Sequence, residues 1–244
     1  MSGHSKWSTI KRQKGANDAK RGLAFTKLSA AITMAVRQGG GITDPNGNFR
    51  LRLAIDAARA QNMPKDTIER AIERGSGKNA TEMFDVVYEG FGPGGFTVIV
   101  EAITDNKQRT TPEIKSIFDK NGGTLGVPGS VNYQFAQRGQ ITVPKNGKSL
   151  EDVFIIAADH GAEDVDEDEG DIIVYTLPED LAKVRSGLEE NGLTITGAEI
   201  VHKPIVIKEL QDQSEADKAI AFLEKLEDHN DVQKVYANFD ISGA

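Results

Sequence analysis

The sequence "FDVVYEGFGPGGFTVIVEAIT", residues 84–104, decides the fold class. Two runs rich in valine, isoleucine and aromatic residues flank GPGG, which is the pattern of a β-hairpin. Gly90, Gly92 and Gly95 fit the spacing G-x-G-x-x-G, but a dinucleotide site needs a helix after the last glycine and here a strand sequence follows. We therefore expect a hairpin turn and the start of a β-containing region.

The residues before the hairpin have the apolar spacing of helices. Residues 20–37 place apolar side chains on one face with a period near 3.6 residues. Asn48 is a candidate N-cap for a second helix over 49–62. In a third helix, Pro64 suits the first position and Gly75 a C-terminal stop. A small helical bundle is predicted, followed by a linker at 74–82.

The residues after the hairpin alternate between helix and strand patterns. We expect a helix that begins at Thr111 as N-cap before Pro112, and then a strand over 130–137. Residues 138–204 form a complete series, strand–helix–strand–strand–helix–strand, which is the ferredoxin-like βαββαβ motif. The last elements, a strand within 205–210, a helix within 214–228 and a strand within 232–239, are too few to fold alone.

The predicted fold class is therefore α+β, with three domains. We expect an N-terminal basic helical bundle over 1–78, a central α+β domain over 79–137 plus 205–244, and an inserted acidic ferredoxin-like βαββαβ domain over 138–204.

Charge is segregated along the chain, although the formal net charge is −8. Residues 1–78 hold 15 lysines and arginines against 6 acidic residues, a net charge of +9. Residues 79–244 hold 14 against 31, a net charge of −17, and 138–204 alone hold 6 against 15, a net charge of −9. Such segregation suggests domains with different partners.

Composition and motifs favour a protein that is not an enzyme. The absence of cysteine excludes disulfides, thiol catalysis and cysteine zinc sites. The acidic run "DVDEDEGD" lacks the glycine and glutamate that a calcium loop needs at its sixth and twelfth positions. The four histidines share no ligand spacing, and no G-x-S-x-G or H-E-x-x-H occurs. We expect neither a metal nor a cofactor.

The sequence also points to a cytoplasmic protein without a membrane partner. No apolar run approaches the roughly 20 residues that span a bilayer, and the N-terminus lacks the apolar core of a secretory signal. No pattern in the sequence specifies an oligomeric state.

The opening stretch, residues 3–22, is the first candidate nucleic-acid-binding site. Its cations can neutralise phosphates, and its tryptophan can stack on a base. With two arginines expected across the bundle, the candidates are Lys6, Trp7, Lys11, Lys14, Arg21, Arg50 and Arg52.

A second candidate is the polar stretch "TDNKQRTT", residues 104–111. One interpretation is an ordinary loop that ends at Thr111 as a helix cap. The alternative is a contact loop in which Asn106, Lys107 and Arg109 meet phosphate or RNA.

Six long stretches resemble the YebC/PmpR family over almost the whole chain. They are "SGHSKWSTIKRQKGANDAKRG", "GGGITDPNGNFRLRLAIDAAR", "NMPKDTIERAI", "YEGFGPGGFTVIVEAITDNKQRT", "NGGTLGVPGSVNYQF" and "DVQKVYANF". The resemblance implies a cytoplasmic bacterial protein of three domains and the family label of probable transcriptional regulator that binds DNA. It also implies kinship with mitochondrial translational activators of cytochrome oxidase and with bacterial proteins linked to ribosomes stalled on proline runs.

Two functions therefore stay open. The first is a DNA-binding transcriptional regulator that uses the basic bundle on the duplex backbone. The second is a ribosome-associated translation factor that contacts ribosomal RNA. The residue chemistry slightly favours the second, because lysine suits phosphate rather than base edges and Trp7 suits an unpaired base.

Overall fold

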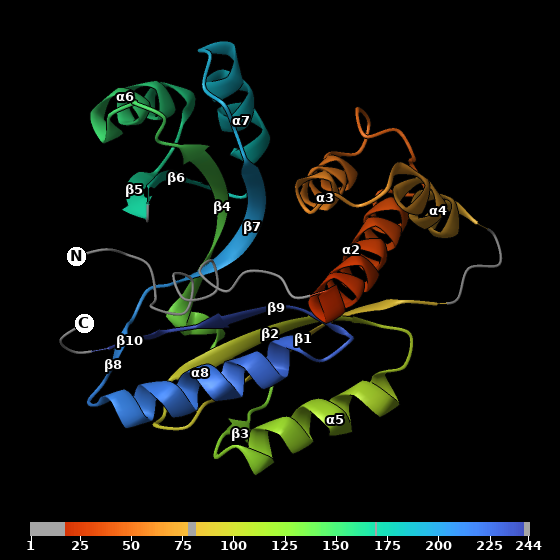
Figure 1. Ribbon diagram of the computed structural model, residues 1–244, viewed down its shortest axis with the longest axis vertical. Helices are drawn as coiled ribbons and strands as arrows, with labels where there is room; N and C mark the ends of the chain where they lie inside the picture. Colours follow the sequence, from red (N-terminus) through yellow and green to blue (C-terminus); the bar gives the residue numbers. More distant parts are fainter. Residues whose placement is uncertain (1–17, 78–81, 169, 242–244) are drawn as a thin grey trace.

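The computed structural model describes residues 18–77, 82–168 and 170–241. Helices and mainly antiparallel sheets alternate along the chain, which confirms the predicted α+β class. Three parts are visible in Figure 1: a helical bundle, a central sheet with two helices beneath it, and a second sheet with two helices of its own.

The helical bundle consists of α2 (Asp18–Gln38), α3 (Phe49–Ala60) and α4 (Lys65–Ser76). Its core includes the buried side chains of Ile32, Val36, Leu51, Ile55 and Ile68. The prediction of Asn48 as N-cap of α3 is confirmed. Its side-chain oxygen accepts a hydrogen bond from the Leu51 N–H at 3.1 Å, and its amide donates to the Ala35 carbonyl at 2.9 Å.

The predicted helix stop at Gly75 is wrong, because α4 continues through this residue to Ser76. Gly75 is buried where α4 crosses α2. A Cβ atom at this position would lie 2.7 Å from Val36 Cβ and 2.8 Å from the Thr33 carbonyl oxygen. The glycine therefore permits close helix packing instead of ending the helix.

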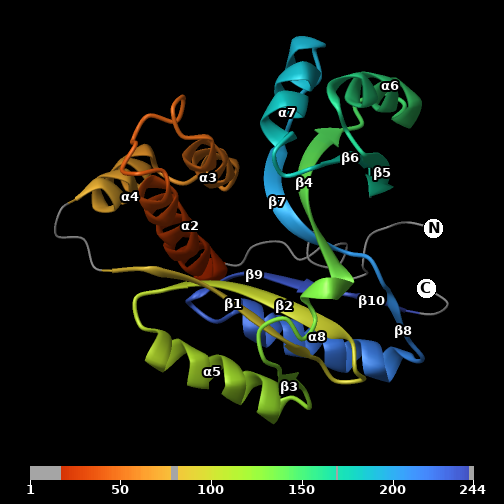
Figure 2. The same ribbon diagram turned by 180° about the vertical axis from the view of Figure 1, so that it is seen from behind.

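The central sheet has the strand order β3-β1-β2-β9. Strands β1 (Phe84–Phe91) and β2 (Thr97–Thr104) form the predicted antiparallel hairpin. They are joined by β3 (Thr124–Leu125) and, from the far end of the chain, β9 (Val232–Ala237). Two helices, α5 (Lys107–Lys120) and α8 (Gln213–Glu227), cover one face of this sheet (Figure 2). Strands β8 (Lys208–Leu210) and β10 (Phe239–Ile241) form a short parallel pair beside it.

The second sheet has the strand order β5-β6-β4-β7, with every neighbouring pair antiparallel. Its elements follow the predicted ferredoxin-like βαββαβ order. They are β4 (Phe135–Pro144), α6 (Leu150–His160), β5 (Asp164–Asp168), β6 (Asp171–Thr176), α7 (Leu181–Glu190) and β7 (Gly197–Pro204). The acidic run that resembles a calcium loop lies in the β5–β6 hairpin.

The predicted separate strand over 130–137 is wrong. Strand β4 is continuous from Phe135, and the residues before it form a short 3-10 helix, η1 (Asn132–Gln134). The loop that leads into η1 donates three backbone N–H groups to the carboxylate of Glu89, so these donors are not available to a sheet. The domain limits at 138 and 204 stay a prediction. The antiparallel pairing of β4 with β7 begins at Phe135, which lies opposite Pro204.

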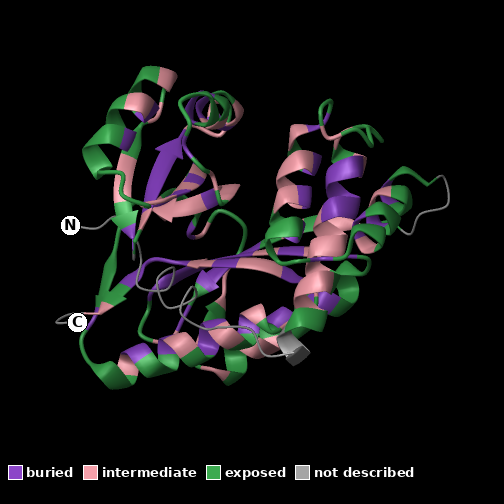
Figure 3. Ribbon diagram, turned by 45° about the horizontal axis from the view of Figure 1, so that its top comes forward, coloured by how far each residue is buried: buried purple, intermediate pink, exposed green. Residues whose placement is uncertain are grey.

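Contacts join the three parts. Phe49 and Leu53 of α3 pack against the core of the second sheet, where Arg185 also forms an ion pair with Asp56 at 2.8 Å. Tyr236 of β9 packs against apolar clusters of both sheets. Figure 3 shows buried residues concentrated in the strands and on the inner sides of the helices.

Candidate nucleic-acid interface

Only some of the predicted site residues fall within the described part of the chain. Lys6, Trp7, Lys11 and Lys14 lie outside it. Arg21 is exposed on the first turns of α2. The others belong to two helix starts: Arg50 and Arg52 lie in the first turn of α3, and Asn106, Lys107 and Arg109 lie at the start of α5.

The two arginines at the start of α3 bind neutral groups. Arg50 donates from Nη1 to Gln38 Oε1 at 2.6 Å. Arg52 donates to the Pro45 carbonyl at 3.2 Å and to Asn46 Oδ1 at 3.4 Å. Within the described residues neither guanidinium forms an ion pair with a carboxylate. Among the residues that the structure describes, both arginines therefore have neutral oxygens as their hydrogen-bond acceptors.

The start of α5 differs from the predicted loop that ends at Thr111, while the contact of Asn106, Lys107 and Arg109 with phosphate or RNA stays a prediction. The helix begins at Lys107 rather than after Thr111, and its N-cap is Asn106, whose side chain accepts the Arg109 N–H at 3.1 Å. Thr111 lies inside the helix, with its hydroxyl oxygen 3.0 Å from that of Tyr88. The interpretation of Thr111 as a cap is therefore wrong, and Asn106 has a structural role.

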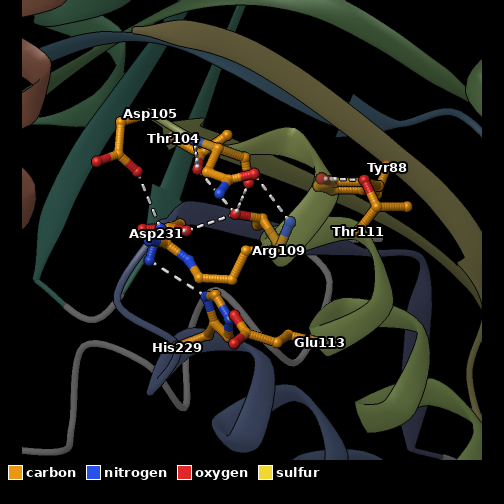
Figure 4. A network of polar contacts seen from close by, with 10 residues as sticks. Tyr88, Thr104, Asp105, Arg109, Thr111, Glu113, His229 and Asp231 are labelled. Carbon is orange, nitrogen blue, oxygen red and sulfur yellow. Dashed lines mark hydrogen bonds and ion pairs between the residues drawn. The ribbon is translucent and has the colours of Figure 1, made fainter. Parts of the chain in front are cut away.

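Arg109 lies in a network of polar contacts between α5 and the loop before β9 (Figure 4). Its Nη2 atom lies 2.8 Å from a carboxylate oxygen of Asp231 and 3.2 Å from one of Asp105. Thr110 donates its hydroxyl to Asp231 at 2.6 Å. Burial raises the pKa of Asp231, but the hydrogen bonds from Thr110 and Arg109 outweigh this effect and lower the pKa below its usual value. Two carboxylates therefore offset the charge of Arg109.

His229 extends this network. Its Nδ1 accepts the Asp231 N–H at 3.2 Å, so Nε2 carries the proton and donates to Glu113 at 3.0 Å. An open groove of about 800 Å³ runs beside these residues, between α5 and the loop after α8. Arg109 is the one lysine or arginine in its described lining, against the three carboxylates of Glu113, Asp228 and Asp231, so the groove does not favour a polyanion. No sequence pattern predicted Asp231 as the partner of Arg109, because 122 residues separate them.

Lys107, at the start of α5, contacts the first residue of β1. Its ammonium group lies 4.3 Å from the ring centroid of Phe84, a cation–π contact, and it forms no ion pair with a carboxylate of the described ranges. The next residue, Asp85, accepts a hydrogen bond from Gln38 Nε2 at 3.2 Å, and Gln38 also accepts from Arg50. Gln38 thus links Arg50 to the start of β1. Phe84 and Asp85 are consecutive residues of this strand and point to opposite faces of the sheet, so Lys107 lies on the face away from Gln38 and Arg50.

Two other kinds of site are absent from the described residues. No group of three or more histidine, aspartate or glutamate side chains is placed to hold a metal ion there. No helix in the same ranges is both long and apolar enough to cross a membrane.

Comparison with known proteins assigns the family. The family model described as TACO1/YebC second and third domain matches residues 83–239, and the model described as TACO1/YebC protein N-terminal domain matches residues 5–78. The chain belongs to the TACO1/YebC family.

Relatives match over nearly their full length. A protein of Desulfotalea psychrophila is 49% identical over 242 residues, covering 99% of this chain and 96% of the relative. A protein of Roseiflexus castenholzii is 48% identical over 249 residues, with the same coverage. Both carry the name "probable transcriptional regulatory protein", which describes a regulator rather than an enzyme.

A solved structure has the same fold. The crystal structure of a conserved hypothetical protein from Aquifex aeolicus superposes with a TM-score of 0.89 at 44% identity, covering 98% of both chains.

Proposed function

We propose that this protein is a nucleic-acid-binding regulator of gene expression that contacts phosphates through Arg50 and Arg52 at the start of α3 and through Lys107 at the start of α5. The observation that carries the proposal is that, among the described residues, these cations contact neutral groups: amide and carbonyl oxygens for the two arginines, and the Phe84 ring for Lys107. Cations without carboxylate partners can neutralise phosphate without first breaking an ion pair. The regulatory name of the relatives supports the same class of function.

The nucleic acid can be DNA, as the family label implies, or ribosomal RNA in a translation factor. The acidic second sheet favours the RNA alternative. Residues 138–204 carry a net charge of −9, which naked duplex DNA repels, whereas a ribosome also presents basic proteins. The basic segment at residues 6–14 adds cations and one tryptophan to either mode of binding.

The salt dependence of binding tests the surface. We expect the double substitution Arg50→Gln with Lys107→Gln to weaken duplex binding and to flatten the log–log salt slope by about 1.8, at about 0.9 per phosphate contact. The matched control removes two cations that already pair with carboxylates, Lys65 with Glu69 and Lys115 with Asp119. Lys65→Gln with Lys115→Gln should leave the slope unchanged. Equal slopes for the two double variants would rule out this surface.

A further inference from the structure

Helix α6 has apolar residues on its outer face as well as on the face that packs against its sheet. Val153 and Ala157 are buried, whereas Leu150, Phe154 and Ile155 expose 37%, 49% and 56% of their surface. An isolated exposed apolar side chain is ordinary, but three of them on one short helix form a surface that a partner can cover.

The exposed residues form a continuous stripe. Leu150, Phe154 and the exposed Ala158 lie at positions i, i+4 and i+8 of one helix, and Ile155 lies beside them. Figures 1 and 2 show α6 on the side of the second sheet away from the helical bundle, with α7 between them. No described element covers the stripe. An uncovered apolar stripe of this kind indicates an interaction surface.

The helix that carries the stripe is fixed at both ends. Ser149 and Asp152 form a capping box at its start, and Gly161 ends it in the left-handed conformation at φ 103°. A surface that is already ordered pays little conformational entropy on binding.

The charge around the stripe selects the partner. Glu151 and Asp159 are exposed on the same helix, within a region of net charge −9. Anionic lipid and nucleic acid would be repelled. A second copy placed by two-fold symmetry would bring the same acidic residues of both copies together. A partner with lysine or arginine around an apolar stripe meets both features.

We propose that the outer face of α6 docks a basic amphipathic helix of a partner protein, with Phe154 and Ile155 at the centre of the contact. This is the helix-to-helix form of apolar recognition, in which side chains at i, i+3 and i+4 provide the anchors. The proposal does not depend on the nucleic-acid surface, because α6 contributes none of the cations assigned to it.

The test uses the full chain and a fluorescein-labelled helical probe peptide of about five turns, roughly 18 residues. Leucines occupy one face of the probe and lysines the rest, and a scrambled peptide of the same composition has no apolar face. Fluorescence anisotropy at physiological salt should show the probe binding at least about tenfold more tightly than the scrambled peptide. Phe154→Ser with Ile155→Ser should remove that advantage, since two central anchors are lost.

The matched control is Ile205→Ser with Val206→Ser, which removes two other exposed apolar side chains and should keep the preference. Unchanged thermal unfolding of both double variants shows that the fold persists. Equal binding of the two peptides, or equal binding by the Phe154/Ile155 variant and the unmodified chain, overturns the proposal. So does a dimer in sedimentation velocity that these substitutions dissolve. Nucleic-acid binding by the same variant should not change, so this proposal and the proposed function can fail independently.

Discussion

At the scale of single residues, Glu89 organises a loop that overlaps the strand wrongly predicted over 130–137. Its carboxylate accepts the N–H groups of Gly129, Val131 and Asn132 at 2.7, 2.8 and 2.9 Å. Burial raises the pKa of this carboxyl group, but the three donors outweigh burial and hold the pKa below its usual value. The ionised form therefore stabilises the fold.

We expect Glu89→Gln to lower the free energy of unfolding at pH 7 by about 2 kcal/mol, because an amide places an NH₂ group where N–H donors already point. With a lowered folded pKa, the contribution is complete above the unfolded pKa of about 4.3 and disappears as the pH falls through the folded value. The difference between variant and unmodified protein should therefore shrink in acid. Urea unfolding at several pH values measures it.

A matched control for that measurement is Glu190→Gln, which changes an exposed glutamate. It should alter stability by less than about 0.5 kcal/mol at any pH. If Glu89→Gln behaves like this control at pH 7, the carboxylate does not hold the loop.

At the scale of elements, the sequence correctly predicted those helices and turns that depend on interactions between nearby residues. The helix after Asn48 and the hairpin at GPGG were predicted correctly because cap and turn chemistry lie within a few residues. The start of α5 was not, because Asn106 and Thr111 are both acceptable caps. The outcome is set by contacts such as that between Arg109 and Asp231, which are 122 residues apart.

In the candidate site, too, local features could be predicted and tertiary contacts could not. The positions of Arg50 and Arg52 at the first turn of α3 follow from the cap. The carboxylates that offset the charge of Arg109 could not be predicted in full, because Asp231 reaches it only through the tertiary fold.

Gly75 provides a test of whether tertiary packing outweighs the local helix preference. In a free helix, replacing glycine by alanine stabilises by about 1 kcal/mol. Here the new methyl group would meet the Thr33 carbonyl oxygen at 2.8 Å, so we expect Gly75→Ala to lower the free energy of unfolding by about 1–3 kcal/mol. Gly22→Ala in α2 is the control, because nothing lies within 4 Å of the added atom and it should stabilise. Thermal unfolding of both variants shows whether each substitution raises or lowers the stability. A stabilising effect of Gly75→Ala would contradict close packing at this position.

At the scale of the whole molecule, the basic helical bundle packs against the acidic second sheet. The bundle contributes Asp56 and two apolar residues to its contact with the acidic second sheet, where Arg185 completes the ion pair. A duplex that follows the basic surface therefore approaches an acidic neighbour, which limits how much backbone it can cover. A ribosome offers RNA for the cations and basic proteins for the acidic part.

This arrangement leads to a prediction that separates the two targets. A site-specific regulator must prefer its site over random DNA by about 4–10 kcal/mol, through base edges or DNA shape. The cations of residues 6–14 are mostly lysines, which suit phosphate, and Trp7 suits an unpaired base. We expect weak, salt-sensitive duplex binding with little sequence preference, beside specific association with ribosomes. Trp7→Ala should weaken that association by about 1–3 kcal/mol, the contribution of one stacked base.

The measurement is competition of labelled protein between purified ribosomes and an excess of random DNA at physiological salt. Tyr133→Ala is the control, because it removes an exposed aromatic side chain outside the proposed surface and should not affect ribosome binding. Retention on one defined promoter fragment, at least about a thousandfold tighter than on random DNA and without ribosome binding, would instead identify a transcriptional regulator. The reason is that only base or shape readout, and not the phosphate contacts proposed for Arg50 and Lys107, can produce discrimination of that size.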